Sequence, residues 1–284
     1  MIAVIYELLL LLTGSIAGAV GALSGLGGGV VLVPILTLLF GVPIEYAAGT
    51  SLLATIATSS SAGSAFVKEK LTNIRIGMSL EIATTIGAIT GALVAAIIYA
   101  HNLPNLIFIT FGAVLFLSVI PSAEGLFRGR FKQSKPDGTT KRFQLHGRYY
   151  DRASKRTIVY NGVRWYLGEA VMFFAGIVSG LLGIGSGALK VIGMDWGMKL
   201  PIKVSTATSD FMIGVTAAAS TAIYLALGFI QPVSAAPVVI GVLIGSFAGA
   251  KIMDITRSNR IRLFFIIVLG LVALEMLLRG LGVI

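Results

Sequence analysis

The stretch SGLGGGVVLVPILTLLFGVPIEYAAGTS, residues 24–51, decides the fold of this chain because it occurs a second time. The second copy contains IGSGALKVIGMDWGMKLPIKVSTATS, residues 184–209, and aligns with the first at a constant shift of 158 residues. The paired positions are Gly27 and Gly185, Gly29 and Gly187, Pro43 and Pro201, Thr50 and Thr208, Ser51 and Ser209, Gly87 and Gly245, and Gly91 and Gly249. We therefore predict a duplicated chain in which each copy carries a glycine cluster followed by a Thr-Ser pair.

The composition is typical of a membrane protein. Hydrophobic residues make up 56% of the chain and charged residues 12%, about half the roughly 25% of a soluble domain. Apolar runs long enough for a span of roughly 20 residues recur throughout. The N-terminal MIAVIYELLLLL does not read as a cleaved signal, since it has Glu7 and no positive charge before its apolar run. The absence of cysteine excludes disulfides and thiolate metal sites, and we expect no cofactor and no metal.

A broken first helix is predicted within the apolar region 8–40, which is too long for one upright helix and too short for two. Each glycine in a helix interior costs about 1 kcal/mol, so the cluster Gly25, Gly27, Gly28 and Gly29 favours a break. We expect a span up to about Ser24, a turn, and a shorter segment that ends at Gly41-Val42-Pro43.

The remaining spans repeat in the same order in both copies. We expect them at about 47–67, 76–100 and 105–120 in the first copy, with a broken segment near 167–193 and spans near 204–228, 233–253 and 260–279 in the second. The predicted fold is an all-α polytopic membrane protein of about eight transmembrane helices. These form two four-helix repeats, residues 1–121 and 167–284, each with a broken glycine-rich segment.

A basic linker, residues 122–166, separates the two copies. It holds eleven Lys and Arg against three acidic residues, which is +8 of the chain's net charge of +10. A basic segment between spans is most simply a loop on the cytoplasmic side, and contact with anionic lipid headgroups is a second role for it. The linker is too short for an ordinary nucleic-acid-binding domain. Its aromatic and β-branched runs FQLHGRYY and RTIVYNGVRW, residues 143–150 and 156–165, predict a small β-hairpin.

The orientation has two solutions. Eight crossings with the linker inside place both termini inside, but they place the basic segments 190–203 and 251–262 outside, against the positive-inside rule. An inverted second copy would move 251–262 inside, as in many transporter repeats. That arrangement requires an odd number of crossings in each copy.

The glycine breaks are the candidate sites for chemistry. Broken backbone inside a membrane must face protein or a water-lined cavity, and the N–H groups that enter the following helix favour an anion. Hydroxyl groups of Thr50, Ser51, Thr208 and Ser209 would add donors. Duplication would bring two half-sites together near the bilayer midplane. The alternative is that the glycines only permit close helix packing and that the hydroxyls bond their own backbone.

Two ionisable residues, Lys190 and Asp210, stand where the first copy has leucine. A charge inside a membrane costs roughly 2.5–3.5 kcal/mol, so each is expected to have a partner. Lys190 could hold an anion, and Asp210 could take up a proton or order Lys190. The alternative is a structural Lys190–Asp210 ion pair. Glu81 and Glu275 are expected to be packing or interface residues.

The chain resembles the TauE/SafE family of sulfite exporters. The resemblance rests on GLGGGVVLVP and AAGTSLLATIATSSSAGS in the first copy and on SGLLGIGSGALKV and KLPIKVSTATSDFMIGVTAAAS in the second. It covers nearly all of the chain except the linker, and it implies an eight-span carrier of sulfur-containing anions. The chain departs from the family pattern at Ser186 and Ile192, where a glycine and a proline are expected. The site residues that it implies are Gly27, Gly28, Gly29, Thr50, Ser51, Gly185, Ser186, Gly187, Thr208 and Ser209.

We therefore expect a secondary transporter, and no enzyme, in the cell membrane. It would move sulfite, thiosulfate or an organosulfonate such as sulfoacetate by alternating access, with proton coupling resting on Asp210 and with Lys190 among the substrate ligands. The alternatives are a passive anion channel, a carrier of a small carboxylate, and a receptor or structural protein. An intramembrane serine protease would need a histidine in a span, and neither His101 nor His146 lies in one.

Overall fold

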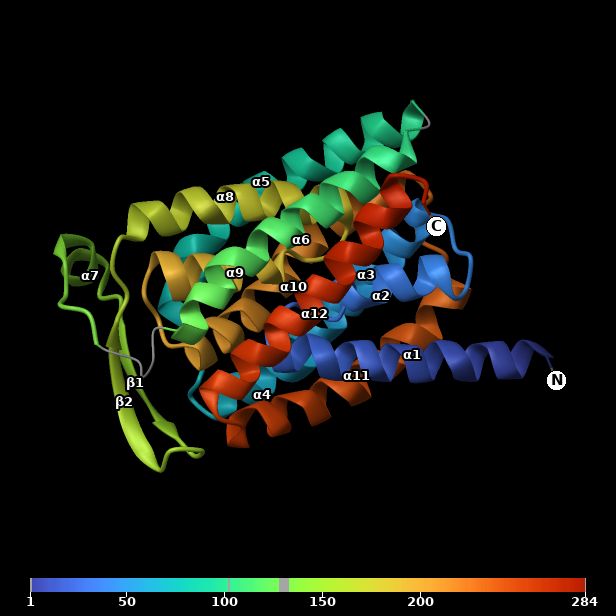
Figure 1. The fold of residues 1–284 in the computed structure, drawn as a ribbon. Coiled ribbons are helices and arrows are strands. Elements are labelled where there is room, and N and C mark those ends of the chain that lie inside the picture. Colours follow the sequence, from blue (N-terminus) through green and yellow to red (C-terminus); the bar gives the residue numbers. More distant parts are fainter. Residues whose placement is uncertain (1, 102, 128–132, 284) are drawn as a thin grey trace.

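The computed structural model describes residues 2–101, 103–127 and 133–283 as a helical bundle with one β-hairpin at its end (Figure 1). Its elements are α1 (Ile2–Ser24), α2 (Gly29–Leu38), α3 (Ile44–Thr58), η1 (Ser59–Gly63), α4 (Ser64–Lys68), α5 (Ile74–Ala100), α6 (Pro104–Phe127), α7 (Gly138–Phe143), β1 (His146–Asp151), β2 (Arg156–Asn161), α8 (Trp165–Leu182), α9 (Gly187–Ile192), η2 (Gly193–Gly197), α10 (Ile202–Ala226), α11 (Pro232–Ile255) and α12 (Ser258–Gly280). The π-helical segment η1 joins α3 to α4 in one continuous rod, as expected for the second span.

Six helices in the described part of the chain are long and apolar enough to cross a membrane. They are Val4–Ser24, Ile74–Ala100, Trp165–Leu182, Ile202–Ala226, Pro232–Ile255 and Ser258–Gly280, and shorter apolar helices are Gly29–Leu38 and Asn105–Ile120. The helical membrane architecture is therefore confirmed, whereas the count of eight spans stays a prediction.

Helix α1 ends at the predicted break, and α2 then turns back along it. A Cβ added to Gly21 of α1 would lie 1.9 Å from the backbone nitrogen of Gly28 at the start of α2. At the other end of the pair, the ring of Tyr6 near the start of α1 lies 5.6 Å from that of Phe40, just after α2. The chain therefore enters and leaves this pair at the same end of the bundle.

The second copy begins with a matching pair, in which α9 and η2 run back along α8. A Cβ on Gly193 would lie 2.8 Å from Val171 Cγ1, and one on Gly197 would lie 3.8 Å from Leu167 Cδ2, near the start of α8. Each pair therefore returns to the end of the bundle at which it begins. The termini and the β-hairpin lie at opposite ends of the bundle (Figure 1).

Glycines bring the long helices of one copy against those of the other. A Cβ on Gly87 of α5 would lie 2.2 Å from the carbonyl oxygen of Phe173 on α8. A Cβ on Gly245 of α11 would lie 1.8 Å from the carbonyl oxygen of Ser15 on α1. Gly87 and Gly245 thus let α5 pack on α8 and α11 pack on α1 with backbone in contact.

The β-hairpin caps one end of the bundle. Strands β1 and β2 pair antiparallel from His146 opposite Asn161 to Asp151 opposite Arg156, which confirms the predicted hairpin. The side chain of Lys203 at the start of α10 is fully buried and bonds Asp151 Oδ1 at 2.8 Å. Arg152 forms ion pairs with Glu69 and Asp254 at 2.6 and 2.8 Å. The hairpin is therefore bound to the ends of α4, α10 and α11.

One element of the linker, the short helix α7, was not expected from sequence. A capping box between Asp137 and Thr140 starts this helix. Asp137 also accepts from the backbone N–H of Arg164 at 2.7 Å, which ties the helix to the start of α8.

Candidate functional site

The two glycine turns meet in the interior of the bundle. Residues 25–28 join α1 to α2, and residues 183–186 join α8 to α9. Residues of both turns are buried, and they touch, since a Cβ added to Gly187 would lie 2.2 Å from the carbonyl oxygen of Gly25. The two short helices therefore begin beside each other, each after a break deep inside the protein.

The backbone of both turns is left-handed. Positive φ angles occur at Gly25 (74°), Gly27 (71°), Gly28 (38°), Gly183 (69°), Gly185 (75°) and Ser186 (54°). This conformation costs an L-residue roughly 1–2 kcal/mol, which glycine avoids. Ser186, the departure from the family pattern, bears that strain, and its buried Oγ has no hydrogen-bond partner among the described residues.

Hydroxyl groups of α3 surround the start of α2. A Cβ on Gly29 would lie 2.4 Å from Ser51 Oγ and 2.9 Å from Thr55 Oγ1. Thr55 donates to the carbonyl oxygen of Gly27 at 3.2 Å, whereas the buried Oγ of Ser51 has no partner within the described chain. Ser51 thus has an unused hydroxyl group beside the N-terminal end of α2. Thr55 was missed from sequence, although its spacing of four residues places it on the same helical face as Ser51.

Ser209 of α10 holds the two turns together. Its Oγ lies 2.9 Å from the carbonyl oxygen of Gly25 and 3.4 Å from that of Gly187. A hydroxyl group has one proton to donate, so the shorter contact is the main hydrogen bond. Thr206, one turn earlier on α10, lies against Gly25, and its buried Oγ1 is without a partner in the described structure.

The two threonines of the repeated Thr-Ser pairs lie elsewhere on their helices. Thr208 Oγ1 accepts from the backbone N–H of Asn73 at 3.0 Å, beside the start of α5. Thr50 is buried on α3, about 100° around the helix from Ser51. The structure therefore brings Ser51 and Ser209 to the glycine turns and places Thr208 at the connection between α4 and α5. Substrate binding by either threonine stays a prediction.

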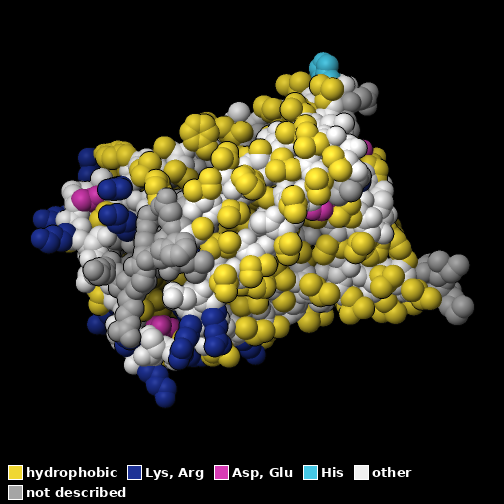
Figure 2. All heavy atoms as spheres, in the orientation of Figure 1, with side chains coloured by type: hydrophobic (Ala, Val, Ile, Leu, Met, Phe, Trp, Pro, Cys, Tyr) yellow, Lys and Arg dark blue, Asp and Glu magenta, His cyan; other side chains and the backbone are white. Residues whose placement is uncertain are grey.

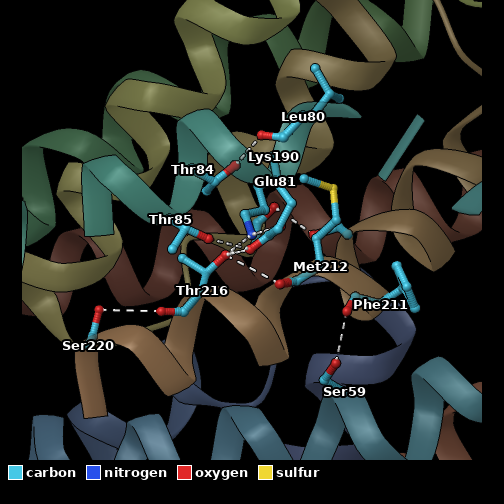
Figure 3. A network of polar contacts seen from close by, with 12 residues as sticks. Ser59, Leu80, Glu81, Thr84, Thr85, Lys190, Phe211, Met212, Thr216 and Ser220 are labelled. Carbon is cyan, nitrogen blue, oxygen red and sulfur yellow. Dashed lines mark hydrogen bonds and ion pairs between the residues drawn. The ribbon is translucent and has the colours of Figure 1, made fainter. Parts of the chain in front are cut away.

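Lys190 belongs to a buried polar network between α5, α9 and α10 (Figure 3). Its side chain is fully buried, and its Nζ donates to Thr216 Oγ1 at 2.5 Å and lies 3.5 Å from Glu81 Oε2. Glu81 Oε1 accepts from Thr216 at 2.6 Å and from Thr85 at 3.3 Å. The partner of Lys190 is therefore Glu81, so the alternative of a Lys190–Asp210 ion pair is wrong, and Glu81 is more than a packing residue.

Asp210 is fully buried on α10, and neither of its carboxyl oxygens has a hydrogen-bond partner among the described residues. An ionised carboxylate buried without a partner is costly, so this position needs an explanation beyond packing. Glu275 of α12 is part-buried, and its carboxyl oxygens are likewise without hydrogen-bond partners in the described part of the chain.

Comparison with known proteins gives consistent matches along the chain. The family model described as sulfite exporter TauE/SafE matches residues 10–276. The probable membrane transporter protein YunE of Bacillus subtilis (strain 168) is 31% identical over 279 residues, covering 96% of this chain and 97% of that protein. The probable membrane transporter protein YdhB of the same organism is 30% identical over 248 residues, with 87% and 89% covered. The probable membrane transporter protein MJ0441 of Methanocaldococcus jannaschii is 29% identical over 287 residues, with 95% of each covered. No solved structure matches the chain.

Proposed function

The chain belongs to the TauE/SafE family of sulfite exporters, and on that premise we propose that it is a secondary transporter for a small sulfur-containing anion. Sulfite, thiosulfate and organosulfonates such as sulfoacetate are the candidate substrates. Transport proceeds by alternating access, in which one site opens in turn to each side of the membrane.

The observation that carries this proposal is the meeting of the two glycine turns. Backbone N–H groups at the start of a helix lack intrahelical partners and attract an anion. Beside them lies the hydroxyl group of Ser51, buried and without a partner in the described structure. A small oxyanion supplies several acceptors and no apolar surface, so it suits this set of donors better than a larger organic ligand.

Two inverted repeats would account for the symmetry of the site. Matched helices begin 158 residues apart, with α2 and α9 at Gly29 and Gly187, α3 and α10 at Ile44 and Ile202, and α5 and α11 at Ile74 and Pro232. The contacts between the two copies are also matched. Helix α1 of the first copy packs on α11 of the second, and α8 of the second copy packs on α5 of the first. An odd number of crossings per copy supports the inversion, as in many transporters.

The end that carries the hairpin is assigned to the cytoplasm. Lysine and arginine gather there, whereas the flank of the bundle in this view is largely apolar (Figure 2). The sequence places basic residues at the end of α4, the starts of α5, α10 and α12, and the end of α11. The inverted arrangement brings these segments to the linker's end and supports the positive-inside rule, which eight crossings would violate.

Two turns are the proposed gates of the alternating mechanism. At the hairpin end, the α4–α5 turn contacts α10 through the Asn73–Thr208 hydrogen bond. At the other end, the α10–α11 turn contacts α3, where a Cβ on Gly49 would lie 2.2 Å from the carbonyl oxygen of Phe229. Each turn belongs to one repeat and contacts the other, so rocking of the repeats would open one end while the other stays closed.

Asp210 is one candidate for the proton-coupling residue, because it is buried without a hydrogen-bond partner in the described chain, next to Ser209 in sequence. If Asp210 takes up the coupled proton, replacing it by Asn abolishes accumulation of thiosulfate driven by a pH gradient in proteoliposomes while preserving thiosulfate exchange. Accumulation by Asp210→Asn at the wild-type level would remove this residue from the coupling mechanism.

The substrate class is tested first by thermal shift of the detergent-purified protein with sulfite, thiosulfate, sulfate, sulfoacetate, taurine and acetate. A ligand at about 100 times its Kd stabilises a protein by about 2.7 kcal/mol, which is measurable. We expect a selective shift with one sulfur anion and saturable uptake of that anion. A shift with acetate alone would favour a carboxylate carrier, and uptake that does not saturate would favour a channel.

A further inference from the structure

The cation of the Lys190–Glu81 ion pair lies on α9, the short helix that begins at the second glycine turn. Lys190 is three residues after Gly187, where α9 starts, and Glu81 approaches it from α5. Both side chains are buried, Lys190 at 0% exposure and Glu81 at 7%. Figure 3 shows the carboxylate of Glu81 beside the side chain of Lys190, whose helix α9 begins at the proposed anion site.

This ion pair is incompletely satisfied. A lysine ammonium group has three N–H donors, and Lys190 directs one of them to Thr216 Oγ1. Its second polar contact is the ion pair with Glu81, in which Oε2 lies 3.5 Å from the ammonium nitrogen. The contact between the two charges is long, and one donor remains for an anion.

We propose that Lys190 exchanges Glu81 for the transported anion and that Glu81 takes up one proton when it loses Lys190. The inference rests on the proposed function and assigns the coupled proton to Glu81 in place of Asp210, so that Asp210→Asn should keep accumulation driven by a pH gradient. The anion competes with the carboxylate for one buried cation, and a buried carboxylate left without a cation favours its protonated form. The proton comes from water on the side where the anion enters and binds Glu81 Oε1, the oxygen that Thr85 and Thr216 contact. It leaves on the other side when the anion departs and the ion pair re-forms.

The hydroxyl groups around Glu81 suit both states of its carboxyl group. Thr216 donates to Oε1 in the paired state, and Thr85 contacts the same oxygen. A hydroxyl group can also accept a hydrogen bond, so a protonated carboxyl group can donate to either threonine. Neither state leaves the carboxyl group without polar neighbours.

Among the described residues, the other charged groups on the helices packed against α5 form no ion pair with Glu81. Asp210 and Lys203 lie on α10, and Lys203 is paired with Asp151 at the hairpin end. Glu169 lies on α8, and neither it nor Asp210 forms an ion pair within the described residues. On α6 the side chains that the structure describes include no titratable group. Lys190 is thus the cation that determines the charge state of Glu81.

The test measures the Kd of radiolabelled thiosulfate between pH 6 and pH 9 for the purified wild type, Glu81→Gln and Lys190→Met, with Glu275→Gln as a control for loss of a buried carboxyl group. In the wild type and the control, uptake of one proton per anion raises the Kd by up to about tenfold per pH unit. Glu81→Gln should bind at least as tightly as the wild type at pH 9, with a Kd independent of pH. Lys190→Met should weaken binding at least tenfold. If the ion pair were purely structural, Glu81→Gln and Lys190→Met would both bind thiosulfate more weakly than the wild type.

Proton uptake can be measured on the wild-type protein, so this test does not require that any variant folds. Thiosulfate is added to weakly buffered wild-type protein, and a pH indicator follows the proton concentration. The protein should take up one proton for each anion that it binds. Binding without proton uptake, or a Glu81→Gln variant that keeps the wild-type pH dependence, would overturn the inference and leave the transport function standing. Failure of the wild type to bind or transport any sulfur anion would instead overturn the proposed function itself.

Discussion

Ser209 connects α10 to the first glycine turn through a single hydroxyl group, and removal of that hydroxyl group should lower the free energy of unfolding. Ser209→Ala leaves the buried carbonyl oxygen of Gly25 without this donor, which costs about 1–3 kcal/mol. The matched control is Ser60→Ala, since Ser60 is exposed and bonds the carbonyl oxygen of Ile56 in its own helix. Chemical unfolding in detergent measures both.

The Ser60→Ala change should stay within about 0.5 kcal/mol of the wild type. Equal stability of the two variants would show that the contact between Ser209 and Gly25 contributes nothing to holding the turns together.

Several site residues could be predicted from sequence because the chain repeats itself. Ser51, Ser209 and the glycines recur at a fixed shift, and the structure gathers them at the two turns. The Lys190–Glu81 pair could not be predicted, because the two residues lie in different copies and neither position repeats. Which carboxyl group meets a buried lysine depends on which helices pack together, and apolar sequence carries little information about that.

At the scale of the helices, the close approach of α5 to α8 depends on glycine. A Cβ on Gly91 would lie 2.0 Å from the carbonyl oxygen of Ile177, so Gly91→Ala must push backbone apart. Overpacking of this kind costs about 1–3 kcal/mol. Gly270 on α12 has no atom within 4 Å of an added Cβ, and Gly270→Ala should be neutral or stabilise by up to about 1 kcal/mol.

Thermal unfolding of the two alanine variants checks this difference. A Gly91→Ala protein as stable as Gly270→Ala would mean that α5 and α8 are not held in backbone contact.

The position of the break in the first helix could be predicted from the sequence, but the direction of the segment after it could not. The break after Ser24 was placed correctly, since clustered glycines oppose a continuous helix. The reversal of α2 along α1 was not determined by the sequence, because a break does not fix the angle between two segments. That angle follows from the left-handed backbone at Gly25, Gly27 and Gly28 and from contacts with α3 and α10. Reversal changes the number of crossings, and with it the side of the membrane on which each loop lies.

For the whole molecule, the docked hairpin predicts a strong dependence on one buried lysine. Lys203→Met leaves Asp151, whose side chain is 6% exposed, without its cation. Breaking a buried ion pair by removing one partner costs about 3–5 kcal/mol. We expect earlier thermal unfolding and faster proteolysis of the linker, whereas Lys199→Met on the neighbouring connection should change neither. Unchanged proteolysis of the linker in Lys203→Met would contradict the docking role of this ion pair.

The same contact predicts how hairpin docking varies with pH. Burial raises the pKa of the Asp151 carboxyl group, but hydrogen bonds from Lys203 and Ser154 and the charge of Lys203 outweigh burial and lower it below its usual 3.8. A carboxyl group with a lowered folded-state pKa contributes stability above the unfolded value and loses it as the pH falls through the folded value. Linker proteolysis should therefore be slow above pH 3.8 and accelerate in more acidic solution, as followed with an acid-active protease.

The central claim, that an anion binds where the two glycine turns meet, is tested most directly at Ser51. Its hydroxyl group has no partner among the described residues, so Ser51→Ala should leave stability unchanged while removing one donor from the site. The measurement is equilibrium binding of radiolabelled thiosulfate and sulfite to wild type, Ser51→Ala and Ser60→Ala. We expect at least tenfold weaker binding for Ser51→Ala, a loss of about 1.4 kcal/mol, and wild-type binding for Ser60→Ala. Wild-type affinity in a correctly folded Ser51→Ala protein would contradict it and place the anion elsewhere.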